Sequence, residues 1–275
     1  MHSQLTLMAV HAHPDDEVLG TGGLLARAAE EGIRTVLVTC TNGEAGDDEH
    51  GRKPTDPGHD AAGVARVRLS ELRESAALLG IGHVELLGHR DSGMQGWDTN
   101  RHPEAFANVP VERAAGRLAE LMERYRPQVV VTYDENGGYG HPDHIQAHRV
   151  AVAATEATGI PDKLYYTAIP RSGVARLMEV LKAGGADLGD VGDVDLPDDF
   201  GVPDEAITSV VDVSAYVERK VKALEAHASQ GENIFLLRMP EEIRRLALGT
   251  ESFIRRRCRV DAPDHEDDLF AGLRG

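Results

Sequence analysis

Residues 5–40, LTLMAVHAHPDDEVLGTGGLLARAAEEGIRTVLVTC, contain two short apolar runs on either side of a longer amphipathic stretch. The runs at residues 5–10 and 35–40 have the length and composition of buried strands. Residues 19–31 have helical spacing and end at Gly32, a residue typical of a helix C-cap. A strand, a helix and a strand in this order predict that the two strands pair in parallel.

The same alternation of strand and helix continues along the chain. Further strands are predicted at three places: residues 83–87, 128–133 and 163–169. Helices are predicted between and after them: residues 64–79, 111–125 and 142–157. This pattern predicts an α/β fold with a doubly wound, mainly parallel sheet and helices on both of its faces. Ligands bind beyond the carboxyl ends of such strands, so we expect the functional residues in the loops that follow them.

The last third of the chain has a different character. An acidic segment rich in Gly, Asp and Pro, residues 184–204, separates a predicted helix at 174–183 from a strand at 207–213 and a helix at 215–229. We find no internal repeat and no sign of an independent second domain. We therefore expect one domain over residues 1–275, in which a core up to residue 170 holds the functional site and the remainder completes the fold.

Charge and composition exclude several classes of protein. The 29 Lys and Arg against 46 Asp and Glu give the chain a net charge of −17, which disfavours binding to a phosphate backbone. Only two cysteines are present, so a disulfide scaffold and a Cys-rich zinc site are excluded. No signal peptide and no apolar run of about 20 residues is visible. We expect a cytoplasmic protein without a nucleic-acid or membrane partner.

The first group of residues that could carry chemistry is HAHPDDE, residues 11–17, directly after the first strand. Histidine and carboxylate are ordinary ligands of a metal such as zinc, and Pro14 restricts the backbone of the loop that would aim them. The alternative is that Asp15 or Asp16 caps the following helix. Glu17 is explained by the helix dipole alone, because it lies in the first helical turn.

A second group with the same order of residues is GHPDH, residues 140–144, which follows the strand ending at Tyr133. Two loops at the same edge of a parallel sheet can converge on one crevice. Together they offer enough histidines and carboxylates for three protein ligands and one open position, the arrangement of catalytic zinc sites. The alternative is two unrelated helix caps.

These motifs resemble the LmbE-like/PIG-L family of zinc-dependent N-deacetylases. The resemblance rests on four segments: AHPDDE at 12–17, TCTNGE at 39–44, Arg68-x-x-Glu71-Leu and GHPDH at 140–144. It is close over residues 5–170 and weaker to about residue 255, where AHASQ at 226–230 and ESF at 251–253 also match. The resemblance implies a Rossmann-like fold.

The resemblance also implies a set of catalytic roles. It implies one Zn²⁺ per chain, with Fe²⁺ as a possible substitute, held by three ligands: His13, Asp16 and His144. Asp15 matches the general base, and His141 matches the residue that stabilises the oxyanion and protonates the leaving amine, as a cationic imidazole. Asp143 is expected to tune or orient His141. Zinc can lower the pKa of a water to about 7 and polarise an amide carbonyl, so these groups together suit amide hydrolysis.

Other residues match family members that act on the glucosaminyl-inositol core of mycothiol. By this resemblance Arg68 and Asp91 bind sugar or cyclitol hydroxyls, and Tyr139 lies beside the acyl group. The alternatives are an ion pair of Arg68 with Glu71 or Glu74, a turn role for Asp91, and a plain loop aromatic at Tyr139. The segment VLGTGG at 18–23 departs from the mycothiol enzymes and follows the general family pattern.

The sequence thus predicts a metal-dependent hydrolase that removes an N-acetyl group from a small amino-sugar molecule or glycoconjugate. An amidase acting on mycothiol S-conjugates is the alternative within the family. A metal- or metabolite-binding protein of the same fold without turnover is a second alternative. A two-metal phosphoesterase is a third, although the motifs supply ligands for one metal only.

Overall fold

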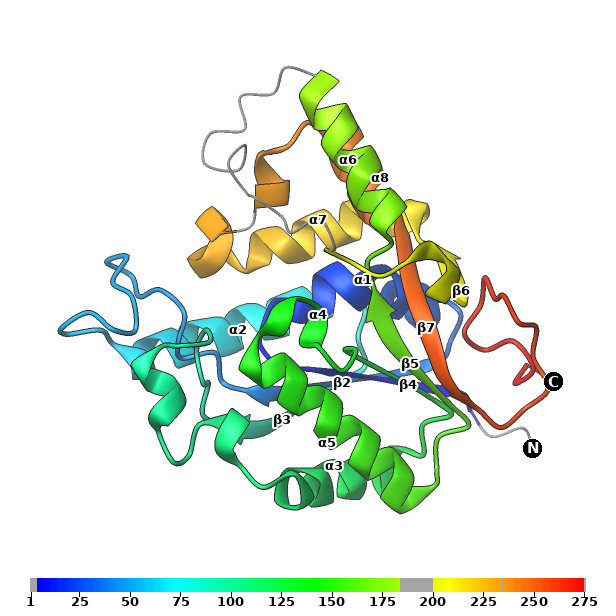
Figure 1. Ribbon diagram of the computed structural model, residues 1–275, viewed down its shortest axis with the longest axis horizontal. Coiled ribbons are helices and arrows are strands. Elements are labelled where there is room, and N and C mark those ends of the chain that lie inside the picture. Colours follow the sequence, from blue (N-terminus) through cyan, green and yellow to red (C-terminus); the bar gives the residue numbers. More distant parts are fainter. Residues whose placement is uncertain (1–3, 184–199, 234, 275) are drawn as a thin grey trace.

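A computed structural model of the chain describes residues 4–183, 200–233 and 235–274 (Figure 1). Its strands form one sheet in the order β3-β2-β1-β4-β5-β7-β6. The first five strands run parallel, and β7 pairs antiparallel with both β5 and β6. The strands span these residues: β1 Thr6–His11, β2 Arg34–Thr41, β3 His83–His89, β4 Val129–Thr132, β5 Lys163–Ala168, β6 Ser209–Asp212 and β7 Thr250–Cys258. The predicted α/β fold with a mainly parallel sheet is confirmed.

Helices cover both faces of this sheet, and the strands alternate their side chains between them. Met8 of β1 joins the apolar cluster under α3 and α5, whereas its neighbour Leu7 joins the cluster under α1 and α2. Figure 1 shows α3 and α5 on one side of the sheet and α1, α2 and α7 on the other. The helices span these residues: α1 Asp16–Glu30, α2 Ala61–Leu79, α3 Val111–Tyr125, α4 Gly137–Gly140, α5 Pro142–Thr158, α6 Arg171–Ala183, α7 Val217–Ala226 and α8 Glu241–Leu248.

The parallel core agrees closely with the sequence prediction, and the differences concern element ends and the C-terminal third. Helix α1 begins at Asp16, three residues before the predicted start, because the acidic motif itself forms its first turn. Strand β7 was not predicted, since three consecutive arginines interrupt its apolar alternation. It nevertheless lies between β5 and β6 in the sheet. Residues 184–199, most of the acidic segment, lie outside the described residues.

The order of the strands determines where a site can form. The chain passes from β1 outward through β2 to β3 and then returns to the other side of β1 as β4. The order therefore reverses between β1 and β4, which is the place where sheets of this kind bind their ligands. Both HPD motifs follow these strands, so the topology brings them together.

A buried ion pair joins the C-terminal third to α1. Lys220 of α7 donates to the carboxylate of Glu251 in β7 at 2.7 Å, and both side chains are buried. The Glu251 carboxylate also accepts the backbone amides of Gly23 and Leu24 at 2.8 Å each. A Cβ atom at Gly23 would lie 2.4 Å from that of Val213, so this close approach requires glycine. Gly23 of VLGTGG therefore serves packing.

No helix among the described residues is both long enough and apolar enough to span a bilayer.

Candidate active site

The loop after β1 carries a strained residue. Asp15 has φ 103° and ψ −30°, in the left-handed region that side chains other than glycine rarely adopt. Such a conformation costs about 1–3 kcal/mol and is typical of functional sites. After the turn at Asp15, the side chain of Asp16 reaches back to His13, whose backbone amide donates to Asp16 Oδ2 at 2.8 Å.

Three side chains from the two motif loops converge on one point. Asp16 Oδ2 lies 3.2 Å from Nδ1 of His13 and 3.4 Å from Nε2 of His144. Around a tetrahedral zinc with bonds of about 2.0–2.1 Å, neighbouring ligand atoms are separated by about 3.3 Å. Both distances to Asp16 Oδ2 are close to this separation.

A further observation indicates that this cluster suits a metal. Nε2 of His144 is buried and has no hydrogen-bond partner among the residues that the structure describes. A buried polar atom without a partner is unfavourable, and a bound cation would satisfy it. His141 also has a ring nitrogen within 4.8 Å of ligand atoms of His13 and His144. The arrangement is therefore a metal-binding cluster of histidines with an adjacent carboxylate.

A second candidate ligand group shares His13 but has less need of a metal. It consists of His13, Asp91 and Asp143. Asp143 accepts hydrogen bonds from the amide and the hydroxyl of Ser92, and Asp91 accepts the amide of Gly93 at 2.8 Å. The group of His13, His141 and His144 has more need of a metal, because Nε2 of His144 makes no hydrogen bond among the described residues. Asp16 Oδ2 beside it accepts hydrogen bonds within the chain, as Asp91 and Asp143 do.

Asp143 contacts a different histidine from the one expected. Its carboxylate lies 3.2 Å from Nε2 of His13, and only its backbone amide reaches His141, donating to Nδ1 at 3.1 Å. A carboxylate behind a metal-binding histidine fixes the ring and its tautomer. The Asp143 carboxylate thus contacts His13, and its backbone amide contacts His141, the histidine that the sequence predicts Asp143 to orient.

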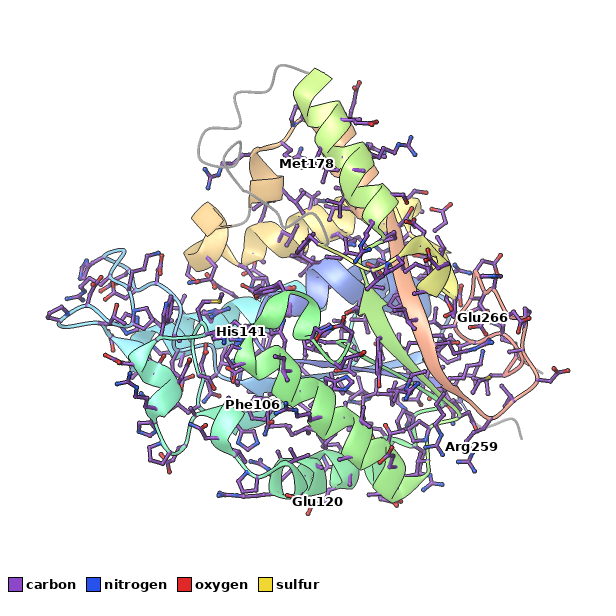
Figure 2. The ribbon with its side chains drawn as sticks, viewed as in Figure 1. Phe106, Glu120, His141, Met178, Arg259 and Glu266 are labelled. Atoms are coloured by element: carbon purple, nitrogen blue, oxygen red, sulfur yellow. The ribbon has the colours of Figure 1, made fainter. Side chains whose placement is uncertain are left out.

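His141 caps the start of α5, where Figure 2 labels it. Because Nδ1 accepts the Asp143 amide, the proton of a neutral ring lies on Nε2. Burial lowers the pKa of His141 to about 3, and the nearby His13 and His144 contribute in the same direction. This shift favours the neutral imidazole, which offers an N–H donor at Nε2, over the cationic form expected from the sequence.

Asp15 lies beside these groups and is paired with Arg68. Arg68 Nη2 lies 3.1 Å from Asp15 Oδ2 and donates to the carbonyl of Pro14 at 2.6 Å. Burial raises the pKa of the Asp15 carboxyl to about 6, an effect that the Arg68 guanidinium partly offsets. The ion pair that the structure gives Arg68 is therefore with Asp15, and not the alternative pair with Glu71 or Glu74. Glu71 instead accepts hydrogen bonds from Ser229.

The other two predicted substrate residues lie at the edge of the cluster. Asp91 Oδ1 is 3.6 Å from Nε2 of His13, and the Asp91 side chain is almost fully buried. Tyr139 is 58% exposed, and its ring centroid lies 5.0 Å from that of His144. It stands in α4, where Gly138 has φ 74°, so the chain around it does not follow a regular helix. Contact of Asp91 and Tyr139 with a substrate stays a prediction.

Sequence reasoning missed Tyr133. Its ring stacks on His144 with centroids 4.2 Å apart, and its hydroxyl donates to Asp16 Oδ2 at 2.7 Å while accepting the Ala12 amide at 2.9 Å. One signal was available, since Tyr133 is a polar-tipped aromatic at the end of the predicted valine-rich strand. Glu17 was also underestimated: it is fully buried and bonded to the Asp15 amide.

Comparison with known proteins agrees with this geometry. The family model described as PIG-L, GlcNAc-PI de-N-acetylase, matches residues 8–155. The 1D-myo-inositol 2-acetamido-2-deoxy-alpha-D-glucopyranoside deacetylase of Acidothermus cellulolyticus is 43% identical over 98% of this chain and 95% of its own length.

Solved structures with lower identity share the fold. The zinc-inhibited form of teicoplanin deacetylase Orf2 has a TM-score of 0.56 at 22% identity and covers 91% of this chain and 98% of its own. The 4-carboxy-2-hydroxymuconate hydratase GalB of Pseudomonas putida has a TM-score of 0.59 at 20% identity, covering 94% and 99%. One fold thus serves different reactions, so these structures show the fold of this chain and not its reaction. By the family match and its similarity to full-length relatives, the chain belongs to the PIG-L family of de-N-acetylases.

Proposed function

We propose that this chain is a zinc-dependent deacetylase that hydrolyses the acetamide of 1D-myo-inositol 2-acetamido-2-deoxy-α-D-glucopyranoside, an N-acetylated amino-sugar conjugate. The relative from Acidothermus cellulolyticus carries the name of this activity and is similar over nearly the whole chain. The observation that supports the chemistry best is the convergence of His13, Asp16 and His144, with an unpartnered buried nitrogen on His144.

In this proposal three atoms would hold the metal: His13 Nδ1, Asp16 Oδ2 and His144 Nε2. Nitrogen and carboxylate ligands suit zinc, and Fe²⁺ can occupy the same kind of site. When bound, the metal supplies a Lewis acid for the amide carbonyl and lowers the pKa of water. Asp143 would keep His13 in the ligating tautomer by accepting the proton on Nε2.

Asp15 is the carboxylate best suited to act as general base. Its side chain is 27% exposed, against 16% for Asp16, 4% for Asp91 and 0% for Asp143, so it is the most accessible of these four. A pKa of about 6 leaves it largely ionised at neutral pH and still basic enough to accept a proton. It can then return this proton to the departing amine.

His141 would act on the carbonyl oxygen of the substrate. The proton on Nε2 allows the neutral ring to donate a hydrogen bond to the negative charge that develops there. Tyr139 is exposed beside this position and would contact the acyl group. Arg68 and Asp91 bond mainly to the chain itself, so we propose that they hold Asp15 and the loop after β3 and touch the substrate only at its edge.

A comparison of substrates tests this function. The purified protein would be assayed for acetate release from N-acetylglucosaminyl-inositol and from N-acetylglucosamine, and for cleavage of a bimane-labelled mycothiol, with zinc supplied or chelated. We expect the inositol conjugate to react fastest and only with metal. Preference for the labelled mycothiol would favour the S-conjugate amidase, and no turnover on any substrate would favour a binding protein.

A further inference from the structure

Glu17 contacts the backbone of the strained residue Asp15. Its Oε2 accepts the Asp15 amide at 2.9 Å, although the two residues are only two positions apart. Asp15 is one of two non-glycine residues with positive φ among the described residues, the other being Arg126. This hydrogen bond thus restrains the backbone at Asp15, the residue with the unfavourable conformation. It also gives a partner to an amide at the start of α1 that has none within the helix.

The other oxygen of Glu17 is held by two distant parts of the chain. Oε1 accepts the hydroxyl of Ser75 in α2 at 2.6 Å, and it lies 2.8 Å from Nε2 of His227, the residue after α7. All three side chains are fully buried. Nδ1 of His227 has no hydrogen-bond partner within the described part of the chain, so the His227 ring makes its hydrogen bond through Nε2 to Glu17.

This burial argues against a role limited to the helix dipole. An acidic residue that serves the dipole is normally exposed to solvent at the first turn. A fully buried carboxylate is unfavourable unless it accepts hydrogen bonds. Glu17 has three donors, which come from the residue before α1, from α2 and from the residue after α7. Such a network fixes geometry more than it adds stability.

We propose that Glu17, Ser75 and His227 form a positioning unit that holds the backbone of Asp15 in the left-handed conformation. The unit aims the Asp15 carboxylate at the reaction centre, so that the C-terminal third contributes to catalysis through His227 without touching substrate. This inference rests on the proposed role of Asp15 as general base. None of the three residues contacts the substrate in this scheme.

The first test replaces Glu17. Glu17→Met keeps the length of the side chain and removes both acceptors, so the Asp15 amide is released. Because a misplacement of about 1 Å can cost about 100-fold in rate, we expect kcat to fall about 10- to 100-fold with KM within about threefold of wild type. Glu17→Gln retains an oxygen that can accept the Asp15 amide and should recover most of the lost kcat.

His227 offers a second pair of variants, which remain informative if Glu17→Met does not fold. His227→Gln can still donate to Glu17, whereas His227→Leu cannot. We expect kcat to decrease at least fivefold more in the leucine variant, with one zinc per chain in both. Equal kcat in the two variants would contradict a positioning role for His227.

A double-mutant cycle separates positioning of Asp15 from general damage. If Glu17 acts through Asp15, Glu17→Met should lower the residual rate of Asp15→Asn less than twofold. Glu251→Gln is the control, because this buried carboxylate also bonds α1 but lies away from the motif loops. It should lower the melting temperature and leave kcat unchanged.

The outcomes distinguish this inference from the proposed function. An inactive wild-type protein overturns the deacetylase assignment itself. If the wild type is active, two results overturn the positioning unit alone. One is a Glu17→Met variant that keeps the wild-type kcat, and the other is a double variant in which the rate losses of Glu17→Met and Asp15→Asn multiply.

Discussion

Replacing Tyr133 with Phe isolates one hydroxyl at the centre of the site. The substitution keeps the ring that stacks on His144 with centroids 4.2 Å apart. It removes the donor to Asp16 Oδ2 and the acceptor of the Ala12 amide. The Ala12 amide is then left buried without its partner, and Asp16 loses a hydrogen bond that holds its ligating oxygen.

The two losses have separate magnitudes. Leaving a buried amide unsatisfied costs about 1–3 kcal/mol, which corresponds to a decrease in melting temperature of about 2–12 °C for a chain of this size. Removing a hydrogen-bond partner of a metal ligand typically lowers metal affinity about 10- to 100-fold. We therefore expect both a less stable metal-free protein and weaker zinc binding.

Both quantities can be measured on the same samples. Zinc affinity is obtained by competition with a chelator at fixed pH, and stability by thermal unfolding of the zinc-depleted protein. Tyr125→Phe is the matched control, since its hydroxyl donates to Glu85 away from the site. Unchanged zinc affinity in Tyr133→Phe, or an equal loss in the control, would refute the role of this hydroxyl.

Two further predictions concern stability. Lys220→Met leaves Glu251 buried without its cation and should destabilise the fold by about 3–5 kcal/mol in urea unfolding; a loss below about 1 kcal/mol would contradict it. Burial lowers the pKa of His89, and Arg117 and Arg113 contribute in the same direction. As the pH falls below about 6.5, the unfolded chain therefore takes up a proton at His89 before the folded chain does, and the free energy of unfolding should decrease. His89→Phe should lose less stability than wild type between pH 7 and 5.5, and identical pH profiles would contradict this reasoning.

The parallel core could be predicted from sequence because its signals are local. The apolar runs around β1 and β2 and the helical spacing between them depend only on neighbouring residues. Strand β7 could not be predicted in this way. Its arginines obscure the alternation, and it becomes a strand by pairing with β5, which lies more than eighty residues earlier.

In the site, too, the features that depend on neighbouring residues could be predicted, and the contacts between distant residues could not. The metal-ligating candidates lie in two short motifs, so their residue types and their positions after strands predicted a metal site there, and the resemblance to the family indicated which three residues would be ligands. The partners of those residues depend on contacts across the fold. Glu17 and His227 are 210 positions apart, and Asp143 and His13 are 130 apart, so no local pattern indicated which side chain supports which.

The proposed reaction requires one metal held by the two motif loops. The most direct measurement is a titration of zinc-depleted protein with Zn²⁺, in which the rate of acetate release from N-acetylglucosaminyl-inositol is followed. We predict that the rate increases linearly and reaches a plateau at one equivalent per chain. Full activity in the zinc-depleted protein, or a plateau only at two equivalents, would contradict the requirement for one metal per chain.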